Sequence, residues 1–279
     1  MAVKLIVDSG CEITAQEANA LGICLVPMLV HFGDREYRAG VDMDSTQFYG
    51  LLADSDTLPT TSQPTPYDFE TVYKQVTKDG SEAVVICISS TLSGTYQSAC
   101  IAAQGYPDKV WVIDTQNVTI GQRILVEYAL QQIDAGCTGA ALAEKLEQAK
   151  KDVCVFGTVD TLEYLVKGGR LSKTAGAVGS LLGIRPLLTV KDGVLTVLSK
   201  PRGTKAANAA LTKAVLEQEM DPNMPRILGY TGVDNTLLMQ YQADNAQLWP
   251  ENTPVVMIGG TIGTHTGPGL IAVGFFRKH

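Results

Sequence analysis

The chain of 279 residues is long enough for two domains of ordinary size, at about 150 residues each. Its 45% hydrophobic and 18% charged residues are typical of a soluble globular protein and argue against disorder. Its net charge of −7 and its lack of a long basic run argue against nucleic acid as the main partner, because neutralising phosphates needs clustered Lys and Arg.

The first half of the chain alternates apolar, β-rich runs with helical patterns, which indicates a parallel sheet covered by helices. The nearly continuous Val and Ile residues at 83–88 suit a sheet covered on both faces, and such sheets bind ligands at the carboxyl ends of their strands. Residues 33–66 are expected to form a long polar loop that contains one short helix. We expect strands at 3–7, 23–32, 83–89 and 109–114, and helices at 15–22, 45–52, 67–78 and 94–104, with further helical patterns up to residue 151.

From Val153 onward, helices alternate with a hairpin whose turn contains Asp192 and Gly193. This change predicts an α/β fold of two domains, residues 1–150 and residues 151–279, with a mixed sheet in the second. In that domain we expect hairpin strands at 187–190 and 194–198, strands at 226–230, 255–258 and 270–276, and helices at 204–219 and 234–249. The apolar start of the chain is too short for a signal peptide and no run of about eighteen apolar residues occurs, so we expect a cytoplasmic protein.

Three short segments combine hydroxyl groups with residues that let backbone N–H groups approach a ligand closely. Residues 263–269 place His265 in a loop rich in Gly and Pro between two expected strands, and residues 60–64 and 89–95 are expected to form hydroxyl-rich turns. Together they predict a buried anion site.

Each segment also has a purely structural interpretation. The hydroxyls near Thr61 can belong to the N-terminal cap of the helix that begins near Pro66, and Ser93 can cap the next helix. A helix N-terminus at Ser93 would favour an anion by about 0.3–1 kcal/mol at an exposed site. A lone histidine such as His265 is more often a structural hydrogen-bond donor than a catalyst.

Two isolated cations lack an apolar pattern that explains them. Arg170 follows a glycine pair at the end of a short helix, and Arg202 precedes a helix whose dipole would oppose its charge. We expect these side chains to face a ligand, a carboxylate or a partner, and the alternative for Arg202 is a solvated surface position. The six cysteines are scattered without a C-x-x-C pair, so no metal site is expected.

Taken together, five segments resemble the DegV family in their order and spacing, and they span nearly the whole chain. They are Asp8-Ser9, Thr61-Ser62-Gln63-Pro64, Ser90 to Tyr96, Thr161 to Arg170, and Gly263 to Gly269. The resemblance implies a DegV-like fold of two α/β domains, with a mostly parallel, doubly wound sheet in the first and a mixed sheet in the second. One long-chain fatty acid would be buried between them. The first loop departs from the family pattern, because Glu12 stands where an aspartate is common.

The resemblance also implies a function in bacterial phospholipid metabolism. The protein would present its fatty acid to a separate fatty acid kinase for acyl-phosphate formation, without catalysis or a cofactor of its own, and with transient contact to a membrane. Arg170 and Arg202 would lie at the ligand mouth or face the kinase. The carboxylate would be held by residues of the three hydroxyl-rich segments, namely Thr61, Ser62, Ser93, Gly94, Thr264 and His265.

A hydrolase acting on an acyl substrate is the alternative function, with Ser93 as nucleophile and His265 as base. The sequence around Ser93 lacks the G-x-S-x-G pattern, and no acid is assigned to orient His265. A nucleotide-binding enzyme is disfavoured because neither a P-loop nor a G-x-G-x-x-G turn is present.

Overall fold

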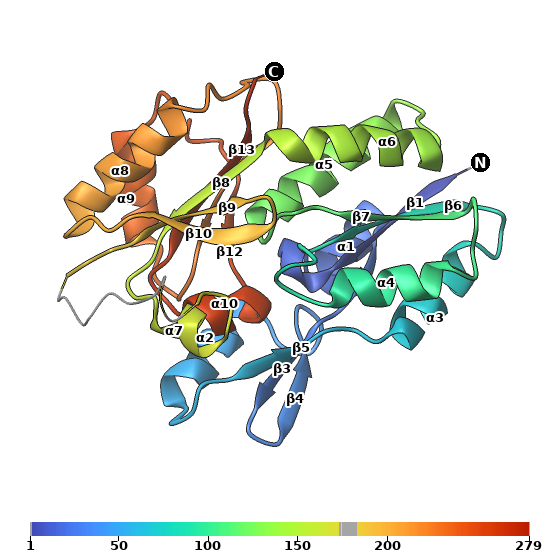
Figure 1. The fold of residues 1–279 in the computed structure, drawn as a ribbon, viewed down its shortest axis with the longest axis horizontal. Helices are drawn as coiled ribbons and strands as arrows, with labels where there is room; N and C mark the ends of the chain where they lie inside the picture. The colour runs from blue at the N-terminus through green and yellow to red at the C-terminus, as the bar shows by residue number, and fades with distance from the viewer. Residues whose placement is uncertain (1, 173, 175–182, 279) are drawn as a thin grey trace.

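The computed structural model describes residues 2–172, 174 and 183–278, which form three sheets and their covering helices (Figure 1). The first sheet has four parallel strands in the order β2-β1-β6-β7. These strands are β1 (Val3–Asp8), β2 (Cys24–Val26), β6 (Glu82–Cys87) and β7 (Val110–Asp114). The expected parallel sheet of the first half is therefore confirmed.

Helices cover both faces of this sheet, as its continuous apolar strands predicted. Ile6 and Val85 pack with α3 (Pro66–Val76) and α4 (Thr95–Ala103) on one face. Val7 and Ile86 belong to the opposite face, in one core cluster with α5 (Ile120–Asp134) and α6 (Gly139–Ala149). The short α1 (Ala15–Leu21) begins at a Thr14 cap and lies against β2.

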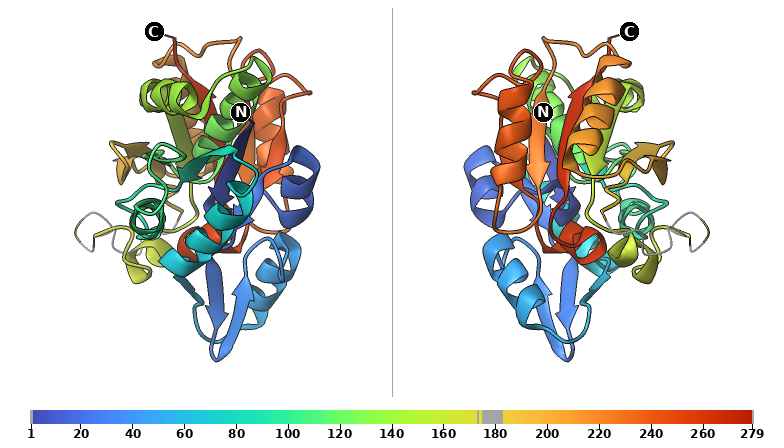
Figure 2. Two further views of the ribbon diagram at one scale, coloured as in Figure 1. Left: turned by 90° about the vertical axis from the view of Figure 1, so that its right-hand side faces the viewer. Right: turned by 90° about the vertical axis from the view of Figure 1, so that its left-hand side faces the viewer.

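A second, three-stranded sheet projects from the molecule (Figure 2). It has the order β4-β3-β5, with β3 (Leu29–Phe32), β4 (Arg35–Arg38) and β5 (Thr60–Ser62), and α2 (Ser45–Asp54) lies between β4 and β5 in the chain. The single strand expected at 23–32 was wrong, because the chain leaves β2 before Pro27, which has no N–H to donate to a ladder. The turn expected at 60–64 was also wrong, since Thr60–Ser62 pairs with β3.

The third sheet has six strands in the order β10-β9-β8-β13-β11-β12, and it is mixed because, among the strand pairs described within this sheet, β11–β12 is parallel and the others are antiparallel. One face packs against α8 (Thr204–Leu216) and α9 (Thr236–Asp244), and the other packs against α5. The predicted hairpin is confirmed, with Asp192 and Gly193 in the left-handed region of its turn. The strands are β8 (Val153–Thr158), β9 (Leu187–Lys191), β10 (Val194–Ser199), β11 (Arg226–Tyr230), β12 (Val255–Met257) and β13 (Ile271–Phe276).

The segment that contains His265 is a helix, so the loop expected at 263–269 was wrong over its first half. α10 (Gly260–Thr266) contains glycines, which disfavour a helix in isolation. Tertiary packing overrides this preference, because neighbouring side chains leave room only for small residues at these positions. A Cβ atom at Gly260 would stand 2.8 Å from the Phe48 ring, and one at Gly263 would stand 2.7 Å from the Tyr49 hydroxyl. The helix ends at Gly267, whose φ of 67° suits glycine.

Helix α5 joins the two larger sheets into one hydrophobic core. It contacts β6 of the first sheet and β8, β11 and β13 of the other, and it lies between the two sheets in Figure 1. Ile120, at its first turn, approaches the backbone of β11 and β13 where Gly229 and Gly274 leave room. The remaining elements are α7 (Glu163–Lys167) and two 3₁₀ turns, η1 (Ser9–Cys11) and η2 (Lys150–Asp152).

Candidate functional site

A largely apolar cavity lies where both halves of the chain meet. It has about 790 Å³ of empty space, including solvent at its mouth, and is walled by the loop after β6, the β9–β10 hairpin, β8, β13 and one face of α10. Its polar lining residues are Thr61, Ser93, Thr119, Arg170, Thr189, Thr261, His265 and Thr266. The hydroxyls of Thr189 and Thr266 donate to the backbone carbonyls of Val155 and Ile262. The polar groups that remain free to contact a ligand therefore come from other side chains.

Thr61 and His265 form the centre of the polar part of the wall. Their Oγ1 and Nε2 atoms are 2.9 Å apart, and they come from β5 and α10, which pack together. Nδ1 of the imidazole is buried with no hydrogen-bond partner among the described residues. Gly168 is packed so closely against this nitrogen that a Cβ atom would clash with it.

Arg170 brings a positive charge to the same place. Its Nε donates to the Leu92 carbonyl at 3.2 Å and its Nη1 donates to the Gly168 carbonyl at 2.8 Å. No carboxylate in the described part of the chain pairs with it. Burial and, to a smaller extent, the nearby Arg170 charge together lower the pKa of His265 to about 4, so the imidazole is neutral at pH 7.

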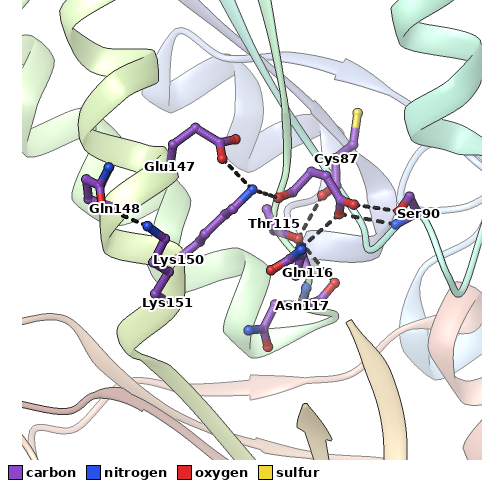
Figure 3. A network of polar contacts seen from close by, with 10 residues as sticks. Cys87, Ser90, Thr115, Gln116, Asn117, Glu147, Gln148, Lys150 and Lys151 are labelled. Carbon is purple, nitrogen blue, oxygen red and sulfur yellow. Dashed lines mark hydrogen bonds and ion pairs between the residues drawn. The ribbon is translucent and has the colours of Figure 1, made fainter. Parts of the chain in front are cut away.

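Ser93, in the loop between β6 and α4, lines the same cavity and follows Leu92, the residue whose carbonyl accepts from Arg170. Its hydroxyl is 2.8 Å from that of Thr95 at the start of α4. The loop itself is fixed by its neighbours, as Figure 3 shows for Ser90, whose hydroxyl donates to Asp114 at 2.5 Å. In the same network, Lys150 donates to the Asp114 carbonyl at 2.9 Å. The loop that carries Ser93 is thus tied to Asp114 at the end of β7.

The other predicted site residues are not in the cavity wall. Ser62 turns to the opposite side of β5 and bonds His31 Nε2 at 2.9 Å, and Thr264 donates to the Gly260 carbonyl at 2.8 Å within α10. Gly94 caps α4 and leaves room for the Gln63 side chain. Arg202 is exposed before α8.

The sequence interpretation missed Thr119 and Thr261. Thr261 lies four residues before His265, so a helix in this segment would have indicated that both share one face. Thr119 has a φ of 50° at the start of α5, an uncommon conformation for a β-branched residue. Its hydroxyl is buried without a partner in the described residues.

The described residues lack both a metal-binding cluster and a membrane-crossing helix. No group of three or more His, Cys, Asp and Glu side chains is placed to hold a metal ion. No helix among them has the length and apolarity that crossing a membrane requires.

Known proteins are similar to this chain in sequence and in fold over nearly their full length. The family model described as "Uncharacterised protein, DegV family" matches residues 2–278. A DegV domain-containing protein of Clostridium perfringens is 32% identical over 286 residues, which cover 99% of each chain.

Two solved structures extend the comparison to the fold. A DegV family protein from Thermus thermophilus, described as binding fatty acid, has 29% identity and a TM-score of 0.88, with 100% of each chain covered. A stearic acid-binding protein from Eubacterium ventriosum has 26% identity and a TM-score of 0.85, covering 100% of this chain and 99% of the other. The fold class expected from the sequence is thereby confirmed, and the chain belongs to the DegV family.

Proposed function

We propose that this protein binds one long-chain fatty acid in the cavity, with the carboxylate at Thr61, Ser93, His265 and Arg170. The observation that carries the proposal is Arg170, a partly buried cation without a carboxylate partner among the described residues, beside hydroxyls in an otherwise apolar cavity. Family members of known structure that bind fatty acids support the same ligand class.

The energetics suit an acyl chain with one charged end. Each buried CH₂ contributes about 0.8 kcal/mol, whereas the carboxylate must find hydrogen bonds to offset its desolvation. If the neutral imidazole of His265 donates from Nε2 to Thr61, the Thr61 hydroxyl keeps its own proton to donate to the carboxylate. Arg170 then neutralises the charge.

A hydrolase is disfavoured by the same contacts. Ser93 Oγ bonds to Thr95, not to His265, and His265 Nε2 bonds to Thr61. No described carboxylate bonds to His265 Nδ1, so the orienting acid of a catalytic triad is missing. We therefore propose a carrier without catalysis of its own.

The carrier would present its acid to a separate fatty acid kinase in the cytoplasm, which forms the acyl phosphate, and would contact a membrane transiently to exchange its ligand. Arg202 supports a partner role because it is exposed and lies outside the cavity wall. The two domains, residues 1–150 and 151–279, would then hold the ligand between them, while the exposed Arg202 side chain would contact the kinase.

The two arginines provide the test. Stearate affinity is measured by titration, and acyl-phosphate formation is measured with a bacterial fatty acid kinase and ATP. Arg170→Ala is expected to weaken stearate binding, because it removes the charge beside the carboxylate. Arg202→Ala is expected to leave stearate affinity unchanged and to slow acyl-phosphate formation. Unchanged stearate affinity in Arg170→Ala would contradict the site, and unchanged kinase turnover in Arg202→Ala would contradict that partner role.

A further inference from the structure

The loop after β1 contains a buried acid that the proposed site leaves unexplained. Glu12 is only 8% exposed and has a φ of 63° at the end of η1. Its Oε2 atom accepts a hydrogen bond of 2.7 Å from the backbone N–H of Gly259. Gly259 is the residue before α10, so Glu12 of the N-terminal half holds the start of a helix from the C-terminal half.

Other residues of the N-terminal half hold α10 in the same way. The Ser9 hydroxyl is 3.2 Å from that of Thr261, and the Tyr49 hydroxyl donates to the Ile258 carbonyl at 2.8 Å. His265 lies six residues after Gly259, which corresponds to about 9 Å along a helix. The contact of Glu12 therefore fixes the end of the helix opposite the Thr61–His265 pair.

The second carboxylate oxygen of Glu12 is not engaged. Oε1 is buried without a hydrogen-bond partner in the described residues. The Thr119 hydroxyl, from a residue of the cavity wall, lies near enough to lower the pKa of Glu12, although the two groups lack hydrogen-bond geometry. Glu12 thus lies directly behind the wall of the acyl cavity.

The charged and titratable groups around Glu12 do not neutralise it. Arg123 of α5 donates to the Glu12 backbone carbonyl at 3.3 Å, while its charge pairs with Glu17 and Glu127. The remaining groups that face Glu12 or share its pocket are acids or neutral, namely Asp8, Cys11, Asp44 and Tyr49. Burial raises the pKa of Glu12 to about 7, against the opposing effects of the Gly259 N–H, Thr119 and Arg123.

We propose that Glu12 is a positioning residue of the acyl-carboxylate site, which anchors the start of α10 through Gly259 and opposes, by its own negative charge, the binding of a second carboxylate. The proposal rests on the fatty acid function proposed above. Two separate consequences follow, one for the order of α10 and one for the pH dependence of binding.

The pH dependence has a definite sign. Neutral Glu12 leaves the site less negative, so affinity for an anionic fatty acid is higher when this group is protonated and falls as the pH rises through about 7. At a spacing like the rise of about 9 Å from Gly259 to His265, two like charges in a protein interior change affinity by roughly tenfold. Burial raises the pKa of Asp8 to about 6, so deprotonation of Asp8 also lowers the affinity for an anionic fatty acid, but at a lower pH. Only the decrease in affinity near pH 7 belongs to Glu12.

The test compares Glu12→Gln, which keeps an oxygen for the Gly259 N–H, with Glu12→Ala, which does not. Stearate affinity is measured relative to wild type between pH 6 and pH 8.5, with exposed Glu251→Gln as control. Glu12→Gln should match wild type at pH 6 and bind roughly tenfold more tightly at pH 8.5. A wild-type pH profile in Glu12→Gln would overturn the charge effect.

Hydrogen exchange of the ligand-free proteins tests the anchor without any fatty acid. Amides of residues 259–267 should exchange faster in Glu12→Ala and at the wild-type rate in Glu12→Gln. Equal exchange in all three proteins would overturn the anchor, even where stearate binds normally. Failure of the wild type to bind stearate would instead contradict the proposed function, so the two failures are distinguishable.

Discussion

At the polar end of the cavity, the adjacent residues Thr61 and Ser62 have different surroundings. Successive side chains of a strand point to opposite faces, so Thr61 reaches His265 while Ser62 reaches His31. The sequence placed both hydroxyls in a turn, where either can face the ligand. Because residues 60–62 form a strand, only one of the two hydroxyls, that of Thr61, lies on the His265 side.

Replacing these two hydroxyls provides a matched pair of variants. Thr61→Val should weaken stearate binding roughly ten- to hundredfold, because a charge-assisted hydrogen bond contributes about 1.5–3 kcal/mol. Ser62→Ala should leave the affinity unchanged. Titration with stearate measures both, and equal losses in the two variants would show that the site does not follow the strand.

The imidazole of His265 should respond to both pH and ligand. Its pKa of about 4 means that the unfolded chain takes up a proton as the pH falls from 6.5, while the folded chain does not, so stability is lost toward pH 4. A bound carboxylate adds an opposite charge and should raise this pKa. An NMR titration of the imidazole, assigned with His265→Gln, measures both effects; a midpoint near 6.5 without ligand, or no shift with stearate, would contradict them.

At the scale of elements, the sequence predicted the large regular segments and missed those that depend on tertiary packing. Strands β1, β6 and β7 of the first sheet and the Asp-Gly hairpin have strong local signals, which the structure confirms. Helix α10 has none, since Gly260 and Gly263 disfavour a helix in isolation and are required only because Phe48 and Tyr49 pack against them. Because this segment was predicted to be a loop, Thr261 was not included in the predicted site.

The glycines of α10 should therefore resist replacement by a better helix former. Gly263→Ala should destabilise the protein by about 1–3 kcal/mol, since the added methyl overpacks the contact with the Phe48 and Tyr49 rings. Gly50→Ala in α2 is the control, because no atom lies within 4 Å of its Cβ position, and it should stabilise by about 0.5–1 kcal/mol. Urea unfolding measures both; a stabilised Gly263→Ala would contradict the packing argument.

At the scale of the whole molecule, each half of the chain completes the other. Helix α5 of the N-terminal half fills the space between the two large sheets, and α10 of the C-terminal half is held by Glu12, Ser9 and Tyr49. The tip of the β9–β10 hairpin, at the Gly193 carbonyl, accepts a hydrogen bond of 2.9 Å from Ser89. These contacts between distant segments close the cavity, and no local pattern in the sequence could show them.

The most direct test of the central claim is native mass spectrometry of the purified full chain, before and after incubation with stearate, with extraction and identification of any bound lipid. The account predicts one fatty acid per chain, either retained from the cell or taken up on incubation, and a weaker complex for Arg170→Ala. A folded protein that carries no lipid and takes up none would contradict the account.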